Sequence, residues 1–199
     1  LRMPGHPAAL RLIEAAGVPI AAPSANRFMQ LSPTTAEHVR RDLGDRVDRI
    51  LDDGPAEVGI ESTVLSLATH PPTLFRPGVI TRAEIEAVIG PVVLPGTVPV
   101  AAHPSPGLHR RHYSPRTKLF IVKDEPLPPG RGAWLYYSER RAAAVERAMP
   151  STPRPFAARL YAVLHELDEE GLDWIAVEKP PDSVDWAGVN DRLARAAAD

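Results

Sequence analysis

Short apolar runs separated by capped helical segments make up the first 90 residues. The predicted strands cover residues 18–22, 46–51, 62–67 and 73–76, where Val, Ile, Leu and Thr favour extended backbone. The predicted helices cover residues 7–16, 35–43 and 81–89. Thr81 and Glu84 have the spacing of a capping box, and Gly90 is suited to end that helix. The pattern predicts a compact α/β segment.

Strands and helices alternate again after residue 117. The predicted strands cover residues 118–123, 132–137 and 173–178, and the predicted helices cover residues 138–148, 156–169 and 184–198. This alternation indicates a small parallel sheet covered by helices. No Gly-x-Gly-x-x-Gly motif follows any of these strands, so a dinucleotide site is not indicated.

Proline dominates the stretch between these two regions. Six prolines fall within residues 91–117, without a sustained hydrophobic period, which is typical of a semi-rigid extended linker. The middle of the stretch, 105–115, also carries arginines, histidines and a tyrosine that a plain spacer would not need. We therefore divide the chain into residues 1–90, a linker over 91–117, and a second α/β domain over 118–199.

Composition narrows the function classes. The chain has 199 residues, 44% of them hydrophobic, a formal net charge of −2 and no cysteine. The hydrophobic content is enough to form a core, and the net charge lacks the positive excess that is typical of nucleic-acid-binding proteins. The absence of cysteine excludes disulfides and thiol nucleophiles. Its seven histidines lack metal-ligand spacing, and no Gly-x-Ser-x-Gly elbow is present. No apolar run has membrane-spanning length, so we expect a soluble cytoplasmic protein.

Small polar residues follow the first predicted strand. Ser24 and Asn26 come after Pro23, which lacks the N–H that a strand ladder needs, and Ser32 stands where the next helix begins. Ligands bind at the carboxyl ends of strands in open α/β sheets, and helix N-termini favour anions. The same residue types are also common in ordinary turns. Taken together, they predict an anion pocket.

Further donors lie beside later strands. Ser62 and Arg76 flank two short apolar runs, and a phosphate or carboxylate needs hydroxyl and guanidinium donors from several elements. Gly59 permits close backbone approach just before Ser62. Glu61 could act as a general base, although a carboxylate in a turn is more often solvated or capping. We assign no catalytic acid or base and no metal ligand.

Several motifs in order along the chain identify a family. They are Pro23-Ser24-Ala25-Asn26-Arg27-Phe28, Ser32-Pro33-Thr34-Thr35-Ala36, Gly59-Ile60-Glu61-Ser62-Thr63-Val64 and Phe75-Arg76-Pro77-Gly78. A Ser-Pro-Gly-x-x-x-x-His-Tyr-x-Pro pattern follows at 105–115. The chain resembles the YrdC-type threonylcarbamoyl-AMP synthases in their longer two-domain form, over nearly its whole length. The resemblance implies a YrdC-like α/β domain joined by the linker to a small Rossmann-like domain.

The resemblance also implies a reaction and a set of site residues. The family joins L-threonine, bicarbonate and ATP into threonylcarbamoyl-AMP and releases pyrophosphate, with Mg²⁺ expected on the phosphates. Carried over by motif, the threonine-binding residues are Arg2, Ala22 and Ser62. The ATP-binding residues are Ser24, Asn26, Ser32, Arg76 and Tyr113, with His112 beside the last. A downstream tRNA threonylcarbamoyl-transferase would use the product, and contact with tRNA or double-stranded RNA is implied as possible.

The chain departs from the family pattern in one respect. It contains neither the family's Lys-x-Arg motif nor its early threonine-contacting Thr. We therefore expect it to be part of a longer enzyme and to be inactive by itself. Two other functions stay open: a carbamoyl-transfer module of the hydrogenase-maturation type, and a non-catalytic RNA-binding module using Arg40, Arg41, Arg110 and Arg111.

Overall fold

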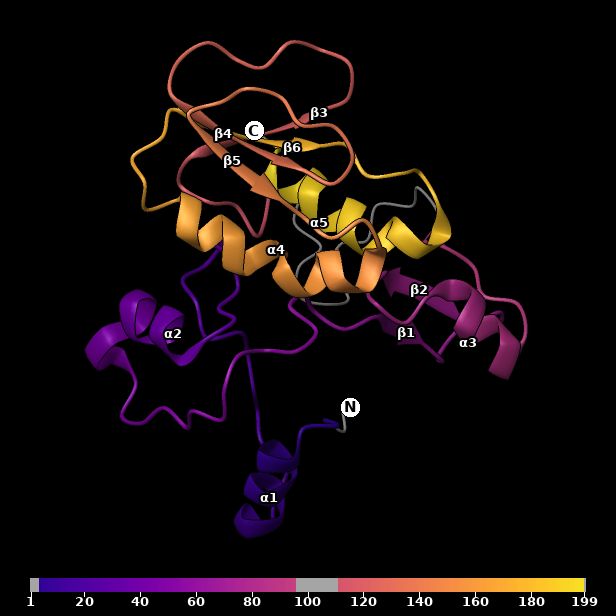
Figure 1. The fold of residues 1–199 in the computed structure, drawn as a ribbon. Helices are drawn as coiled ribbons and strands as arrows, with labels where there is room; N and C mark the ends of the chain where they lie inside the picture. The colour runs from indigo at the N-terminus through magenta and orange to yellow at the C-terminus, as the bar shows by residue number, and fades with distance from the viewer. Residues whose placement is uncertain (1–3, 96–110, 199) are drawn as a thin grey trace.

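The computed structural model describes residues 4–95 and 111–198 (Figure 1). Its helices are α1 (Pro7–Ala16), α2 (Ala36–Leu43), α3 (Arg82–Ile89), α4 (Pro153–Leu167) and α5 (Ala187–Ala196), with 3₁₀ turns η1 (Gly44–Arg46) and η2 (Val184–Trp186). Its strands are β1 (Val64–Ser66), β2 (Thr73–Arg76), β3 (Lys118–Val122), β4 (Gly132–Tyr136), β5 (Val145–Ala148) and β6 (Trp174–Glu178). The α/β class predicted from the sequence is confirmed.

A four-stranded parallel sheet organises the C-terminal part of the chain. Its order is β3-β6-β4-β5, so β6 pairs with β3 on one side and with β4 on the other. Helices α4 and α5 lie on the same face of this sheet (Figure 1). Trp134 and Trp174 belong to a smaller cluster on the other face, together with Leu127 and Ala143 from the connecting loops. Within residues 4–95 and 111–198, the predicted parallel sheet therefore has helices on one face only.

The N-terminal part contains little regular structure. Strands β1 and β2 form an antiparallel pair, and α1 lies apart from the rest of the described chain (Figure 1). Among its described residues, only Leu31, Ile60, Leu74 and Val92 are buried apolar side chains. Large apolar side chains such as Leu51, Leu67 and Val88 are instead more than 70% exposed. Most of the apolar core of the described chain therefore lies in the C-terminal part.

Two predicted strands in this part do not form. Residues 18–22 and 46–51 have no strand assignment, although their composition favours one. A strand is stable only when a neighbour completes its hydrogen-bond ladder. In the described ranges the two-stranded sheet consists of β1 and β2 alone, so neither segment has a ladder partner there.

The predicted helix over 138–148 is wrong. Val145–Ala148 instead forms β5, which pairs in parallel with β4 through Ala133 and Val145. Glu178 accepts hydrogen bonds from the backbone N–H groups of Tyr137 and Ser138, at 2.7 and 2.9 Å, and so fixes the chain as it leaves β4. Tertiary pairing here outweighs the helix propensity of the alanines and arginines.

Close backbone packing joins the two parts. Gly59 lies against the backbone of α4, where an added Cβ would meet the carbonyl oxygen of Ala157 at 2.4 Å. Gly188, in α5, lies against the backbone of Gly78, where an added Cβ would meet the Gly78 carbonyl oxygen at 2.9 Å. The segments that carry Glu61 and Arg76 are therefore placed by α4 and α5 as well as by their own strands.

Candidate functional site

A polar cluster centred on Glu61 lies at this junction. Ser32 donates its hydroxyl to Oε1 of Glu61 at 2.5 Å, and Tyr161 of α4 donates to Oε2 at 3.2 Å. Arg192 of α5 donates Nε to Oε2 at 2.7 Å and Nη2 to the Glu61 carbonyl at 2.8 Å. Three elements far apart in sequence thus converge on a single carboxylate.

The surroundings of Glu61 keep it ionised. Burial of the carboxyl opposes ionisation, but the Arg192 charge and the hydrogen bonds from Ser32 and Arg192 outweigh it, so the pKa of Glu61 is lowered. Burial, followed by the negative charge of Glu61, raises the pKa of the Tyr161 hydroxyl well above its usual value. Glu61 is therefore an acceptor and Tyr161 a donor at neutral pH. Because its carboxylate is fully engaged, Glu61 is better placed to hold the junction than to take up a proton.

Arg76 and Tyr113 form the other half of the cluster. Arg76, at the end of β2, is 3% exposed and donates Nε to the Ser62 carbonyl at 3.1 Å. It also donates Nη1 to the Tyr113 hydroxyl oxygen at 3.3 Å. The Arg192 guanidinium lies over the Tyr113 ring, 5.4 Å from its centre. The predicted residues Ser32, Ser62, Arg76 and Tyr113 are thus linked through one network.

Hydrogen bonds made by its two neighbours in the chain hold Tyr113 in this position. Ser114 donates its N–H to Met29 at 3.0 Å and its hydroxyl to the Ala196 carbonyl at 3.1 Å, while His112 donates its N–H to Arg195 at 3.3 Å. Tyr113 itself has a φ of 59°, which is uncommon for a residue with a large side chain. Such strained conformations gather at functional sites and persist only where the surrounding structure enforces them.

The remaining predicted site residues are not part of this network. Ala22 and Ser24 are exposed in an irregular segment, and Arg2 lies outside the described residues. Asn26 donates Nδ2 to the Arg27 and Gln30 carbonyls at 3.0 and 2.9 Å. Its Oδ1 is buried and has no hydrogen-bond partner in the described part of the chain. The ligand-binding roles of all these residues stay predictions.

Sequence reasoning missed Tyr161 and Arg192. Both lie on helices of the C-terminal part, where a tyrosine among leucines is typical of a core position and an arginine of a solvated face. Only the folded chain brings them to Glu61. The one local signal was the Gly59-Ile60-Glu61-Ser62 motif. Its glycine was expected to permit a close backbone approach, and in the structure the backbone that approaches it is that of α4.

Two stacked histidines join α2 to α4 beside Ser32. The rings of His38 and His165 lie 3.9 Å apart, and His165 Nε2 lies 3.1 Å from the Ser32 carbonyl oxygen. Burial and the neighbouring His165 lower the pKa of His38 to about 4. Burial likewise lowers the pKa of His165. The pair is therefore neutral at pH 7.

Acid is expected to weaken the contact between α2 and α4. A histidine whose folded-state pKa lies below its unfolded value of 6.5 stabilises the fold above pH 6.5, and this contribution is lost as the pH falls toward 4. The free energy of unfolding is measured by urea titration at pH 7 and at pH 5. Its decrease from pH 7 to pH 5 should be smaller in His38→Gln than in the parent. His70→Gln, at an exposed position, serves as the control. Equal pH dependence in all three proteins would contradict this reading.

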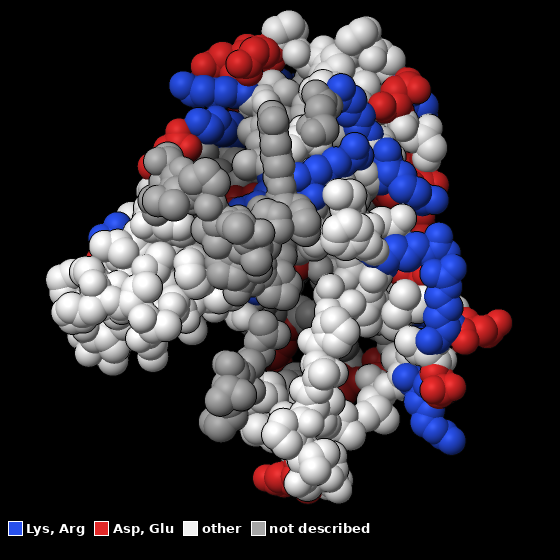
Figure 2. Space-filling model, turned by 180° about the vertical axis from the view of Figure 1, so that it is seen from behind, with Lys and Arg blue, Asp and Glu red and all other residues white. Residues whose placement is uncertain are grey.

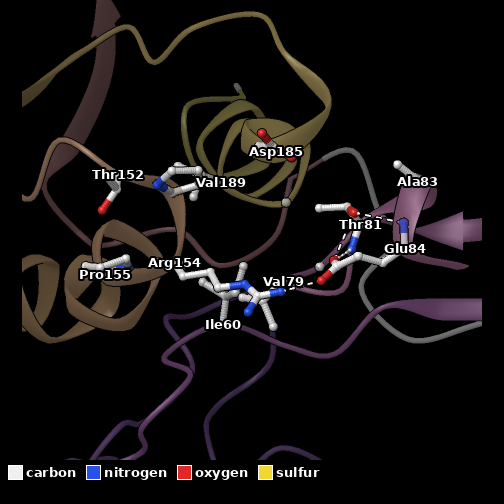
Figure 3. Close-up of a pocket in the computed structure, with 14 residues that line it drawn as sticks. Ile60, Val79, Thr81, Ala83, Glu84, Thr152, Arg154, Pro155, Asp185 and Val189 are labelled. Atoms are coloured by element: carbon white, nitrogen blue, oxygen red, sulfur yellow. Dashed lines mark hydrogen bonds and ion pairs between the residues drawn. The ribbon is translucent and has the colours of Figure 1, made fainter.

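A pocket of about 530 Å³ lies beside the cluster, where the first turns of α3 and α4 meet α5 (Figure 3). Its wall includes the apolar side chains of Ile60, Val79 and Val189. Arg154 reaches from α4 toward α3 and donates Nη2 to Glu84 at 2.5 Å (Figure 3). Because Ile60 precedes Glu61, the pocket borders the polar cluster without being lined by it.

The arrangement suits anion binding and positioning rather than proton transfer. Buried guanidinium groups and hydroxyls from separate elements are the donors that phosphates and carboxylates need.

In the described ranges no group of three or more His, Cys, Asp or Glu side chains could hold a metal ion. The longest described helix, α4, has 15 residues, and no helix there is long and apolar enough to cross a bilayer.

Models of known protein families match nearly the whole chain. The family described as "Threonylcarbamoyl-AMP synthase, C-terminal domain" matches residues 80–198, and the family described as "Telomere recombination" matches residues 1–78. The threonylcarbamoyl-AMP synthase of Bacillus subtilis is 40% identical over 99% of this chain, and that of Pyrococcus abyssi is 35% identical over 99%. The chain spans 62% and 63% of the length of these two relatives.

Solved structures agree with the sequence comparison. The crystal structure of P. abyssi Sua5 complexed with L-threonine superposes with a TM-score of 0.88 at 31% identity, covering 98% of this chain and 63% of that one. A P. abyssi Sua5 variant with adjacent His→Ala and Tyr→Ala substitutions superposes with a TM-score of 0.87 at 30% identity, covering 98% of this chain and 62% of that one. The matched residues, the fold and the identities together place this chain in the threonylcarbamoyl-AMP synthase family.

Proposed function

We propose that this protein joins L-threonine, bicarbonate and ATP into threonylcarbamoyl-AMP and releases pyrophosphate. The observation that carries the proposal is the 40% identity to the B. subtilis synthase over 99% of the chain. The L-threonine in the related Sua5 crystal structure supports the choice of amino acid. The product would supply a tRNA threonylcarbamoyl-transferase.

The proposed reaction needs positioning and charge neutralisation more than acid–base catalysis. Bicarbonate and the threonine amine form a carbamate with loss of water, and a carbamate oxygen then attacks the α-phosphorus while pyrophosphate leaves. Arg76 would neutralise phosphate charge, and the Ser32 and Ser62 segments would orient the two substrates. Mg²⁺ would be held mainly by the nucleotide phosphates, because Mg²⁺ in such sites binds substrate phosphates with few protein ligands.

The proposal includes the domain organisation. Residues 1–90 would belong to the YrdC-like catalytic domain, residues 91–117 would form a linker over the active site, and residues 118–199 would form a Rossmann-like domain. Residues 96–110 of this linker, Arg110 among them, lie outside the described residues. At its described end, the contacts of Tyr113 with Arg76, and of Ser114 with Met29, support a return to the predicted ATP site. His112-Tyr113 is the one His-Tyr pair in the chain, and a His-Tyr pair is what was replaced in the Sua5 variant.

The function is tested in an enzyme that contains this chain together with the family's Lys-x-Arg segment, by supplying ATP, L-threonine and bicarbonate and measuring pyrophosphate together with the mass of the adenylate. We expect product that depends on all three substrates there, and none from residues 1–199 alone. Carbamoyl phosphate in place of bicarbonate and L-threonine tests the carbamoyl-transfer alternative. Pyrophosphate release with carbamoyl phosphate but not with bicarbonate and L-threonine would overturn the proposal.

A non-catalytic RNA-binding module is the other alternative. Figure 2 shows Lys and Arg side chains running across one face of the molecule, with Asp and Glu side chains beside them. On α2, Arg40 pairs with Glu37 at 3.3 Å and Arg41 pairs with Glu169, so this part of the surface is partly neutralised. RNA binding with a steep salt dependence and no binding of ATP or L-threonine would favour this alternative.

A further inference from the structure

Arg192 is a fully buried cation in the C-terminal part of the chain, and it donates hydrogen bonds to residues of the N-terminal part. It lies on α5, is 0% exposed and donates to both the carboxylate and the carbonyl of Glu61. Its Nη1 also donates to the Pro77 carbonyl at 3.0 Å and to Asp191 at 2.7 Å. All three guanidinium nitrogens are therefore engaged, and two of their acceptors are backbone carbonyls.

These acceptors lie next to the predicted ligand-binding residues. The Glu61 carbonyl belongs to the peptide bond with Ser62, and the other bound carbonyl is that of the residue after Arg76. The guanidinium also lies 5.4 Å from the centre of the Tyr113 ring, whose hydroxyl oxygen accepts from Arg76. One side chain of α5 thus contacts three of the four segments that carry the predicted residues of the network, and the fourth, at Ser32, is linked to it through Glu61.

Stability alone does not account for this arrangement. A buried ion pair seldom stabilises a protein more than well-packed apolar side chains of the same size would, because both charges lose their hydration. What a guanidinium offers beyond an apolar side chain is several donors in a rigid plane, which fix the orientation of each acceptor. Arg192 uses this property to fix the backbone at Glu61 and the backbone at Pro77 relative to each other.

We propose that Arg192 is a positioning residue for the threonine- and ATP-binding segments. Through it, the C-terminal α/β part holds the Ser62 and Arg76 segments in their binding geometry. The inference rests on the proposed function, and it gives the C-terminal part a role in that reaction.

The test compares Arg192→Met and Arg192→Lys with the parent, each in an enzyme that contains this chain together with the family's Lys-x-Arg segment. Methionine removes all the donors, whereas lysine keeps the charge for Glu61 but cannot bind two carbonyls in one plane. We expect the dissociation constants for L-threonine and ATP, measured by calorimetry, to rise at least about 10-fold in the methionine variant and by less in the lysine variant. Arg147→Met, which removes a half-exposed ion pair with Glu170, should leave both constants unchanged.

Hydrogen exchange of the unliganded proteins separates positioning from general loss of stability. In Arg192→Met, amides of residues 60–63 and 74–78 should exchange at least about 10-fold faster, while those of β4 and β6 keep their protection. Faster exchange throughout the chain would indicate a merely structural role and overturn the inference. Parent-like affinities in the methionine variant would also overturn it. If the parent binds neither substrate, the proposed function fails and the inference fails with it.

Discussion

Replacing Arg76 with methionine is expected to lower the rate of threonylcarbamoyl-AMP synthesis about 100-fold or more, the size of effect seen when one preorganised donor to developing charge is removed. Arg76 is buried and is oriented by the Ser62 carbonyl and the Tyr113 hydroxyl, so little reorganisation is needed when phosphate charge develops. Steady-state pyrophosphate release at varied ATP concentration measures the effect.

Two further variants make this result specific. Tyr113→Phe removes only the hydroxyl that orients Arg76, so its rate should fall less, by about 10-fold. Arg82→Met removes a nearby cation that pairs with Glu86 on the surface of α3, and it should leave the rate unchanged. A folded Arg76→Met protein with the parent rate and the parent KM for ATP would exclude Arg76 from the nucleotide site.

The C-terminal part could be predicted from the sequence because its elements carry their own signals. Strands β4 and β6 are buried along nearly their whole length, so they appear as short continuous apolar runs between turn residues. In the N-terminal part, the capping box at Thr81 and Glu84 likewise forms as predicted and starts α3. The misassigned segment at 145–148 is an edge strand in which two adjacent charged residues stand between Val and Ala, and only its pairing with β4 determines its conformation.

The site was only half predictable, for a related reason. The motif residues Ser32, Ser62, Arg76 and Tyr113 converge, because each lies beside an element that the sequence identifies. Arg192 and Tyr161 reach the same place from more than 90 residues away, and no local pattern records such a contact. A carboxylate in a turn is most often solvated or capping, and the sequence favoured that interpretation for Glu61. In the structure, its partners Ser32, Tyr161 and Arg192 make it the centre of the junction.

The contact between Gly59 and α4 should be among the most sensitive positions in the chain. Gly59 has a φ of 77°, and an added Cβ would meet the Ala157 oxygen at 2.4 Å and the Ala158 Cα at 2.5 Å. Both are backbone atoms of a helix, so neither can move aside easily. Gly54 has a similar φ of 87° but nothing within 4 Å of an added Cβ. The two glycines therefore share the backbone strain and differ only in the steric clash.

Alanine at each position measures the two effects separately. Gly54→Ala should cost about 1–2 kcal/mol, the strain of a left-handed residue with a Cβ, whereas Gly59→Ala should cost about 3–5 kcal/mol because overpacking is added. Urea denaturation gives both values. Since the clash displaces Ile60, Glu61 and Ser62 from α4, Gly59→Ala should also lower synthesis by about 10-fold or more at temperatures where it is folded. Equal losses for the two variants would mean that the segment can move away from α4 without cost, and that the close packing of the two parts does not hold the cluster together.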